Sequence, residues 1–333
     1  MGITLVTGAA GFIGSHLTEA LVRSGRKVRA LVQEDSRHLE FIKKLSVELV
    51  YCDLLDKSGL EKAMDGVDEV FHLAAVVRPR KWFYSRAGLF KELDKVNHEG
   101  TRNLADLAGG RVKNFVYYSS IAAAGVRPFV DETSGARPET EYGSSKRNGE
   151  LYLLDLHRKS GFPVKIVRPG TVYGPGNLHM SLVFNFLKFS FFPFFGKGNN
   201  SLPFIYVDNM IDATLLVAEK APSGETYFVV EDPMSMREFF GGLAAGIGRR
   251  LSGFYVPMWL IYPGFFLKEV IERLFFFRFF PLRMDIRLAT AKVACGDWVC
   301  GNQKIKDLGW KPAVGREESL LRTARWYADN NLV

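Results

Sequence analysis

The chain contains 333 residues, of which 47% are hydrophobic and 24% are charged, and its formal net charge is +8. This is an ordinary globular composition, and the length is sufficient for two lobes. Three cysteines (Cys52, Cys295 and Cys300) give no even disulfide framework, and the last two lack a second ligand pair for zinc. The positive charge comes without a nucleic-acid recognition motif, so we expect neither a metal nor a nucleic-acid partner.

The first predicted element is a buried parallel strand over residues 3–7, which is apolar and rich in β-branched side chains. Three glycines follow at Gly8, Gly11 and Gly14, and residues 12–23 have the apolar spacing of a helix. Glycines permit a tight turn and let backbone N–H groups approach a diphosphate at the N-terminus of a helix. The segment therefore predicts a dinucleotide-binding turn.

Further predicted strands alternate with helix-prone segments along the chain. They lie at residues 28–32, 47–52, 70–74, 115–119 and 164–167. This alternation predicts an α/β fold with a doubly wound parallel sheet, the Rossmann arrangement. A break in composition near Gly174 predicts a domain boundary after residue 175.

Tyr142 and Lys146 are four residues apart, so they face the same side of a predicted helix. A phenol has a pKa near ~10, and a neighbouring ammonium favours its ionised form. The pair therefore predicts an acid/base residue whose pKa is lowered by a nearby positive charge.

Taken together, these motifs resemble the extended short-chain dehydrogenase/reductase family over nearly the whole chain. The resemblance is carried by the glycine turn, by Tyr118-Ser119-Ser120, by Tyr142-x-x-x-Lys146, by residues 168–175 and by residues 306–312. It implies a dinucleotide-binding domain over residues 1–175 and a smaller, mostly helical substrate-binding lobe over residues 176–333. Part of 203–230 is expected to pack back onto the first domain.

The resemblance also implies roles for individual residues. Tyr142 would be the acid/base, Lys146 would hold the nicotinamide ribose, and Ser120 would hydrogen-bond the reacting oxygen, with Ser119 as the close alternative. Asn97 is as readily a helix-stabilising residue as a direct participant. The expected cofactor contacts are Gly8, Gly11, Phe12, Ile13, Gly14, Asp53, Leu54, Ala74, Ala75, Asn97, Tyr142, Lys146, Pro169 and Val172.

The end of the second strand should discriminate NAD from NADP. Val32 stands where relatives that use NAD usually carry Asp, and Gln33 replaces the Arg that often follows in relatives that use NADP. Arg37 could reach a 2′-phosphate, whereas Glu34 and Asp35 would repel one. The cofactor is therefore NAD or NADP, with a slight preference for NAD.

One absent arginine bears on the substrate. Relatives that act on nucleotide sugars typically carry an Arg at the position of Leu202. Residues 196–209 look more like the 3β-hydroxysteroid and sterol-carboxylate dehydrogenase branch. This favours an oxidoreductase that interconverts a hydroxyl and a ketone on a sterol-like or isoprenoid-like substrate. The alternatives are a nucleotide-sugar epimerase or dehydratase, and a non-catalytic NAD(P)-binding scaffold.

Phenylalanines are concentrated in two segments. Of 27 Phe, seven lie in residues 184–195 and seven in residues 265–280. The longest charge-free run near the second segment, residues 251–267, is 17 residues long, whereas a membrane span needs about 20. Aromatic and basic residues together suit a membrane interface, and a substrate pocket or a homodimer contact is the alternative. We expect a cytoplasmic protein, with peripheral membrane contact through these segments as one option.

Overall fold

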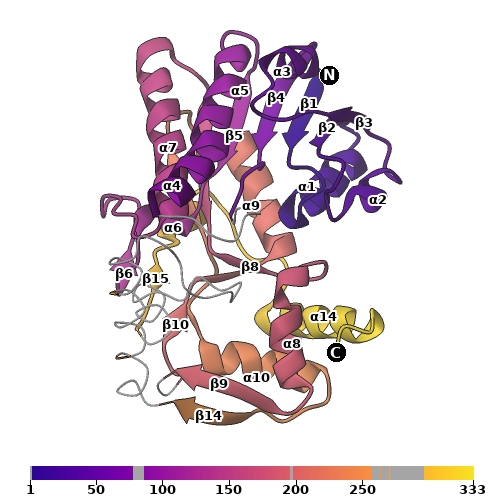
Figure 1. The fold of residues 1–333 in the computed structure, drawn as a ribbon, viewed down its shortest axis with the longest axis vertical. Helices are drawn as coiled ribbons and strands as arrows, with labels where there is room; N and C mark the ends of the chain where they lie inside the picture. The colour runs from indigo at the N-terminus through magenta and orange to yellow at the C-terminus, as the bar shows by residue number, and fades with distance from the viewer. Residues whose placement is uncertain (1, 78–85, 196–197, 257–262, 264–269, 271–295) are drawn as a thin grey trace.

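The computed structural model describes residues 2–77, 86–195, 198–256, 263, 270 and 296–333 (Figure 1). The second phenylalanine-rich segment, residues 265–280, lies outside the described residues.

A seven-stranded parallel sheet forms the centre of the first lobe, in the order β12-β7-β5-β4-β1-β2-β3. Its strands are β1 (Ile3–Thr7), β2 (Lys27–Val32), β3 (Glu48–Tyr51), β4 (Val67–His72), β5 (Asn114–Tyr118), β7 (Val164–Pro169) and β12 (Thr226–Val229). All six strands predicted in the first 175 residues are present, and the predicted α/β doubly wound fold is confirmed. The strand expected at 70–74 spans Val67–His72 instead. It ends before Ala74, whose backbone N–H donates to the side-chain oxygen Thr7 Oγ1 at 3.2 Å and not to the sheet.

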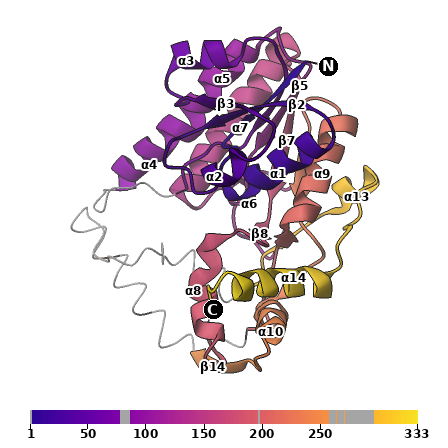
Figure 2. The ribbon, with the colours of Figure 1, turned by 90° about the vertical axis from the view of Figure 1, so that its right-hand side faces the viewer.

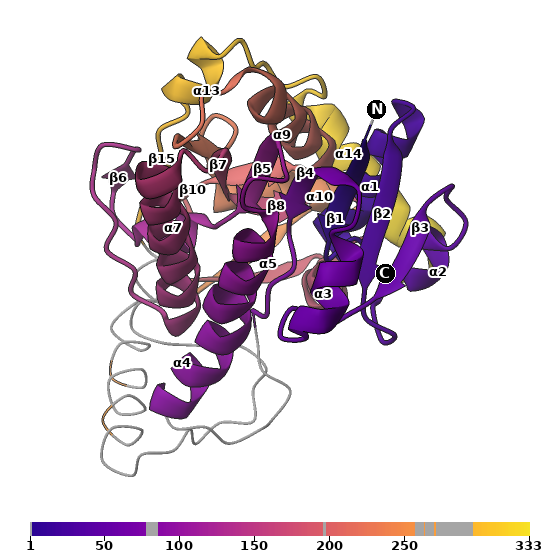
Figure 3. The same ribbon diagram turned by 90° about the horizontal axis from the view of Figure 1, so that it is seen from above.

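Helices cover both faces of this sheet (Figure 3). One face packs on α1 (Phe12–Arg23), α2 (Leu39–Ile42) and α9 (Val207–Lys220), and the other packs on α3 (Lys57–Ala63), α5 (Thr101–Ala108) and α7 (Glu141–Ser160). The remaining helices of this lobe are α4 (Arg86–Asp94), a π-helical turn at Lys95–Gly100, and α6 (Ile121–Ala124). Two apolar cores, one on each face, follow from this arrangement.

The second lobe lies beyond the carboxyl edge of the sheet, with α14 between the sheet-bearing lobe and α10 (Figures 1 and 2). Its elements are η2 (Leu178–Met180), α8 (Ser181–Leu187), α10 (Met236–Gly246), α14 (Arg316–Asp329), and the paired strands β9 (Phe191–Phe195) and β14 (Ser252–Val256). Short strand pairs complete it: β8 (Thr171–Tyr173) with β11 (Phe204–Tyr206), β10 (Ser201–Leu202) with β13 (Met234–Ser235), and β6 (Phe129–Val130) with β15 (Val299–Cys300).

The two lobes do not correspond to two continuous halves of the sequence. β12 is an edge strand of the main sheet, and α13 (Gln303–Asp307) brings Ile305 into the core shared by α1 and α9. β12 falls within 203–230, the range of which part was expected to return to the first domain. The division at residue 175 itself stays a prediction.

In the part of the chain that the structure describes, no helix combines the length and the apolarity that crossing a membrane requires.

The packing of α7 on the sheet gives a stability prediction. A Cβ added at Gly149 would lie 2.4 Å from Tyr117 Oη and 3.2 Å from the carbonyl oxygen of Asn97, both in a buried region. A Cβ at Gly241, in the middle of α10, would meet nothing within 4 Å. We expect Gly149→Ala to destabilise the protein by about 1–3 kcal/mol through overpacking. Gly241→Ala should stabilise it by up to about 1 kcal/mol through helix propensity.

Urea unfolding of the wild type and both variants measures the two changes in the free energy of unfolding. Both variants carry the same Gly→Ala substitution, so the two changes can be compared directly. A Gly149→Ala protein as stable as the Gly241→Ala protein would contradict the close contact between α7 and β5.

Candidate active site

The glycine turn has the close backbone approach that its sequence predicted. Gly8 has a φ of +68°, and a Cβ at Gly14 would lie 2.1 Å from the carbonyl oxygen of Gly8. Gly11 is the N-cap of α1 and offers no side chain, so the first N–H groups of this helix have no side-chain cap. Phe12 and Ile13 form the first helical turn. Such a helix start fits an anionic group such as a diphosphate.

The exit of β4 lies directly beside this turn. A Cβ at Gly8 would be 2.8 Å from the backbone nitrogen of Ala74, so the backbone at Ala74 lies close to Gly8 and Ala75 follows it in the chain. A buried chain of hydrogen bonds fixes the position: Thr7 Oγ1 to His72 Nδ1 at 2.7 Å, and His72 Nε2 to Thr101 Oγ1 at 2.9 Å. Burial, and then the charge of Lys146, hold the pKa of His72 well below its usual value. His72 is therefore a neutral structural residue.

The segment after β3 is also held in place. Asp53 Oδ1 accepts from the backbone N–H of Leu55 at 2.9 Å, and the carbonyl of Leu54 accepts from Asn103 Nδ2 at 3.1 Å. Leu54 is buried against the π-helical turn, where a Cβ at Gly100 would lie 2.8 Å from its Cβ. The adenine contact expected of Asp53 and Leu54 stays a prediction.

Asn97 connects the exit of β4 to α7. Its Nδ2 donates to the carbonyl of Val76 at 2.9 Å and to Ser145 Oγ at 2.9 Å, and its Oδ1 accepts from the backbone N–H of Val76 at 2.7 Å. The side chain is fully buried. These contacts support the structural role rather than direct contact with a cofactor. Asn97 lies in the π-helical turn, a feature that often marks functional sites and that the sequence pattern did not indicate.

Ser120 and Tyr142 are brought together by close packing of α6 and α7. A Cβ at Gly143, in the first turn of α7, would lie 2.3 Å from the carbonyl oxygen of Ala122 in α6. Ser120 caps α6 by accepting from the backbone N–H of Ala122 at 3.1 Å, and its hydroxyl acts on Tyr142 by lowering the pKa of that phenol. Ser119 is buried, with 4% of its surface exposed. The arrangement supports Ser120 over Ser119.

The predicted electrostatic effect of Lys146 on Tyr142 is wrong for this structure. Burial raises the pKa of Tyr142 to about 12, and the hydrogen bond with Ser120 opposes that rise. Burial also lowers the pKa of Lys146 to about 7, against the opposite influence of Glu150. Near neutral pH the amine therefore carries only part of a charge. Desolvation of both groups thus outweighs the attraction that sequence spacing suggested.

Lys146 Nζ is a buried donor with no hydrogen-bond partner among the described residues. Its side chain is 1% exposed, and Nζ lies 4.2 Å from the centre of the Tyr117 ring. An unsatisfied buried amine is costly and usually has a functional explanation. The two hydroxyls of a nicotinamide ribose would supply the missing acceptors, so the site fits the expected cofactor.

A buried ion cluster anchors α7 to the end of β7, and the sequence reasoning missed it. Arg168 donates to both carboxylate oxygens of Glu150, each at 2.7 Å, and Arg147 donates to the same carboxylate at 2.7 Å. Glu150 is fully buried, and the guanidinium of Arg168 is almost so. The signal available in the sequence was an acidic residue four positions after Lys146.

Pro169 and Val172 lie where the two lobes meet. Pro169 ends β7 beside Val229 of β12, and Val172 in β8 pairs with Ile205 of β11. Together with the glycine turn after β1, Ala74 after β4 and Ser120 after β5, they stand at the carboxyl ends of parallel strands. Cofactors bind at this edge of an open α/β sheet.

The turn that should discriminate NAD from NADP lies against the glycine turn. The backbone N–H of His38 donates to the carbonyl of Ala10 at 3.2 Å, and the N–H of Gln33 donates to Ser36 Oγ at 3.2 Å. Val32 is buried, whereas Gln33 and Arg37 are exposed. The residues after β2 are therefore next to the expected diphosphate position. Among the described residues, no cluster of His, Cys, Asp or Glu is arranged to hold a metal ion.

Comparison with known proteins agrees with this geometry. Residues 4–229 match the model of the NAD dependent epimerase/dehydratase family. The chain is 31% identical to sterol demethylase protein B of Methylococcus capsulatus, covering 84% of each chain. It is 29% identical to 3beta-hydroxysteroid-dehydrogenase/decarboxylase isoform 1 of Arabidopsis thaliana, covering 96% of this chain and 78% of the relative.

Among solved structures, a UDP-glucose 4-epimerase of Thermus thermophilus in complex with NAD superposes with a TM-score of 0.74 at 25% identity, covering 98% of this chain and 99% of the other. The chain therefore belongs to the NAD-dependent epimerase/dehydratase family, and it is an enzyme of the extended short-chain dehydrogenase/reductase type.

Proposed function

We propose that the protein interconverts a hydroxyl and a ketone on a hydrophobic, sterol-like or isoprenoid-like substrate, with NAD as the redox partner. The observation that carries the proposal is the set formed by Ser120, Tyr142 and the unpaired buried amine of Lys146. NAD supplies the hydride acceptor or donor when it is bound.

The roles of the protein groups follow from their positions. Tyr142 passes a proton to or from the substrate oxygen, because burial keeps its hydroxyl protonated at neutral pH and Ser120 acts on the same hydroxyl. Ser120 donates to the same substrate oxygen and stabilises charge that develops on it. Lys146 binds the ribose hydroxyls and thereby orients the cofactor.

The surroundings of Leu202 support a lipophilic substrate. Leu202 is partly buried and packs against two apolar clusters, one built on Phe204 and Phe239 and the other on Val230 and Trp298. An arginine that grips a sugar-nucleotide diphosphate is thus replaced by an apolar contact. The names of two relatives, sterol demethylase protein B and a 3beta-hydroxysteroid-dehydrogenase/decarboxylase, support the same substrate class.

A nucleotide-sugar epimerase or dehydratase is the second candidate, and the whole-chain likeness to the UDP-glucose 4-epimerase favours it. A non-catalytic scaffold is disfavoured because it would not need a costly buried Lys146 without a hydrogen-bond partner. Purified protein should be screened with sterols, other lipophilic alcohols and nucleotide sugars, reading the absorbance of reduced cofactor. Turnover of nucleotide sugars alone would replace the proposal with the second candidate.

Tyr142→Phe tests the acid/base assignment. The variant lacks the phenolic hydroxyl and with it the transferable proton, so turnover should fall by on the order of 10²-fold or more while NAD affinity is retained. Initial rates and calorimetric NAD titration measure the two quantities. A variant with near wild-type turnover would show that another group moves the proton.

Lys146→Met tests whether the buried amine is present for the cofactor. The pKa of Lys146 is lowered from 10.5 to about 7 in the folded protein, so folding with a protonated amine costs free energy. The penalty is complete below about pH 7 and fades as the pH rises towards the unfolded value. We therefore expect the variant to be more stable than wild type without cofactor, by a margin that shrinks between about pH 7 and pH 9.

The same substitution should weaken NAD binding and abolish most turnover. Denaturant titrations at several pH values, with and without NAD, give both readings. If Lys146→Met destabilised the cofactor-free protein at pH 7, the amine would have a structural partner and the assignment would fail.

A further inference from the structure

The first phenylalanine-rich segment divides into core and surface residues. Phe184 and Phe194 are buried, and Phe192 stacks on Phe240 with ring centres 3.8 Å apart. These rings are therefore core contacts, and residues 184–195 do not lie in a membrane interface as a whole. Phe189, by contrast, is 75% exposed, and Phe191 is 36% exposed.

Phe189 projects from a strained turn at the end of α8. The next residue, Ser190, has a φ of +58°, which is unusual for a residue other than glycine. Ser190 is held there because its carbonyl accepts from both the backbone N–H and the Oγ of Ser252, at 2.9 and 2.8 Å. A large apolar side chain is thus fixed in an exposed position among the described residues.

Other exposed apolar side chains lie on the same lobe. Of the eleven large hydrophobic side chains that are exposed in the described residues, five lie between η2 and β14: Leu178, Leu182, Phe189, Phe191 and Tyr255. In Figures 1 and 2 the β9–β14 pair forms the end of the molecule opposite the main sheet. Phe189, Phe191 and Tyr255 lie in this pair or directly before it, so three exposed apolar side chains are present at this end.

Four basic residues lie near this end. Lys188 Nζ lies 5.3 Å from the Phe189 ring centre, and the Arg237 guanidinium lies 5.4 Å from that of Tyr255. Arg249 and Arg250 precede Ser252, the residue that holds the Phe189 turn. None of these four cations forms an ion pair with an acidic side chain of the described residues. Three of them are exposed.

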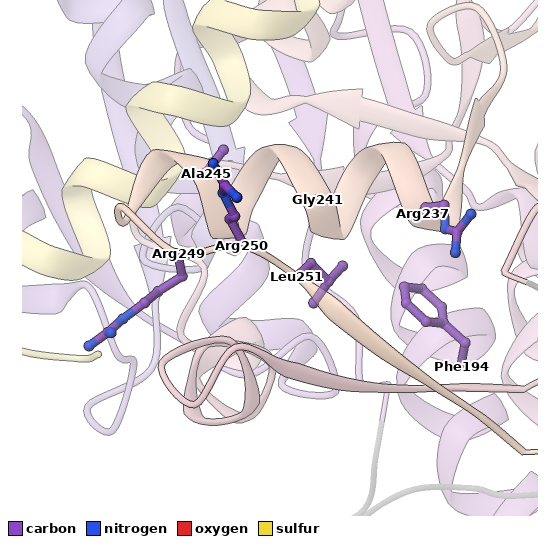
Figure 4. A pocket seen from close by; sticks show the side chains of 7 residues that line it. All are labelled: Phe194, Arg237, Gly241, Ala245, Arg249, Arg250 and Leu251. Atoms are coloured by element: carbon purple, nitrogen blue, oxygen red, sulfur yellow. The ribbon is translucent and has the colours of Figure 1, made fainter.

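Figure 4 shows the arginines around a groove of about 360 Å³ beside α10, with Arg237 near one end of the helix and Arg249 and Arg250 at the other. Phe194 and Leu251 contribute its apolar wall. The groove includes none of Ser120, Tyr142 and Lys146, so it is distinct from the candidate active site.

We propose that this end of the second lobe, the Phe189 turn with Lys188, Arg237, Arg249 and Arg250, docks on an anionic lipid bilayer. An apolar tip with cations on the same end of the lobe matches the acyl and headgroup layers of such a surface. A second copy of the chain fits less well, because a two-fold contact would bring these cations of both copies together. The inference rests on the proposed function and extends it, because a membrane is the source from which a lipophilic substrate reaches an enzyme.

The test is co-sedimentation of the full-length protein with vesicles. Two compositions are compared, phosphatidylcholine alone and phosphatidylcholine mixed equally with phosphatidylglycerol. Wild type should bind the anionic vesicles more strongly, and Phe189→Ser should reduce the partition coefficient by about tenfold or more. The double variant Arg249→Ser/Arg250→Ser should reduce it by about tenfold and lower its salt dependence by about half, because Lys188 and Arg237 remain.

Matched controls lie on the first lobe. Phe41→Ser changes an aromatic residue that is 38% exposed on α2, and Arg158→Ser changes an exposed arginine at the end of α7. Both controls should bind vesicles as wild type does. Circular dichroism and NAD binding confirm that every variant is folded.

The inference is overturned if wild type remains in the supernatant with both vesicles, or if Phe189→Ser binds as wild type does. It is also overturned if light scattering finds a wild-type dimer that Phe189→Ser converts to a monomer, because the surface would then join two copies. Vesicle binding is measured without substrate. Binding without turnover of any lipophilic alcohol would therefore contradict the proposed function and leave the docking surface supported.

Discussion

A buried, unpaired amine is the constraint on which the rest of the site depends. Lys146 Nζ has no partner among the described residues, and its burial lowers the pKa to about 7. Such a group costs on the order of a few kcal/mol and persists only where the surrounding structure fixes it. The surrounding structure does so through α7, which cannot rotate or slide without breaking buried polar contacts.

Three independent contacts hold α7 in register. Glu150 is bound by Arg168 at the end of β7, Ser145 is bound by Asn97 of the π-helical turn, and Gly149 allows Tyr117 to approach the helix backbone. The same contacts set Tyr142 beside Ser120 at the carboxyl edge of the sheet. The enzyme thus uses its most buried polar groups to position the reacting ones, which is the usual compromise between stability and activity.

The sequence predicted what depends on local spacing. The glycine turn, the strands and the one-turn separation of Tyr142 and Lys146 are visible in consecutive residues, and all are present in the structure. It did not predict the Glu150–Arg168 pair or the Asn97–Ser145 bond, because these join residues 18 and 48 positions apart. The direction of the pKa of Tyr142 was also wrong, since desolvation depends on tertiary burial. Counting phenylalanines likewise could not separate buried Phe184 from exposed Phe189.

The most direct test of the account follows a single atom. A sterol alcohol deuterated at its carbinol carbon is incubated with the enzyme and NAD, and the reduced cofactor is analysed by mass spectrometry. Hydride transfer predicts one deuterium in the reduced cofactor for each ketone formed. Unlabelled cofactor, or conversion of a nucleotide sugar without net formation of reduced cofactor while the sterol is unchanged, would contradict the account.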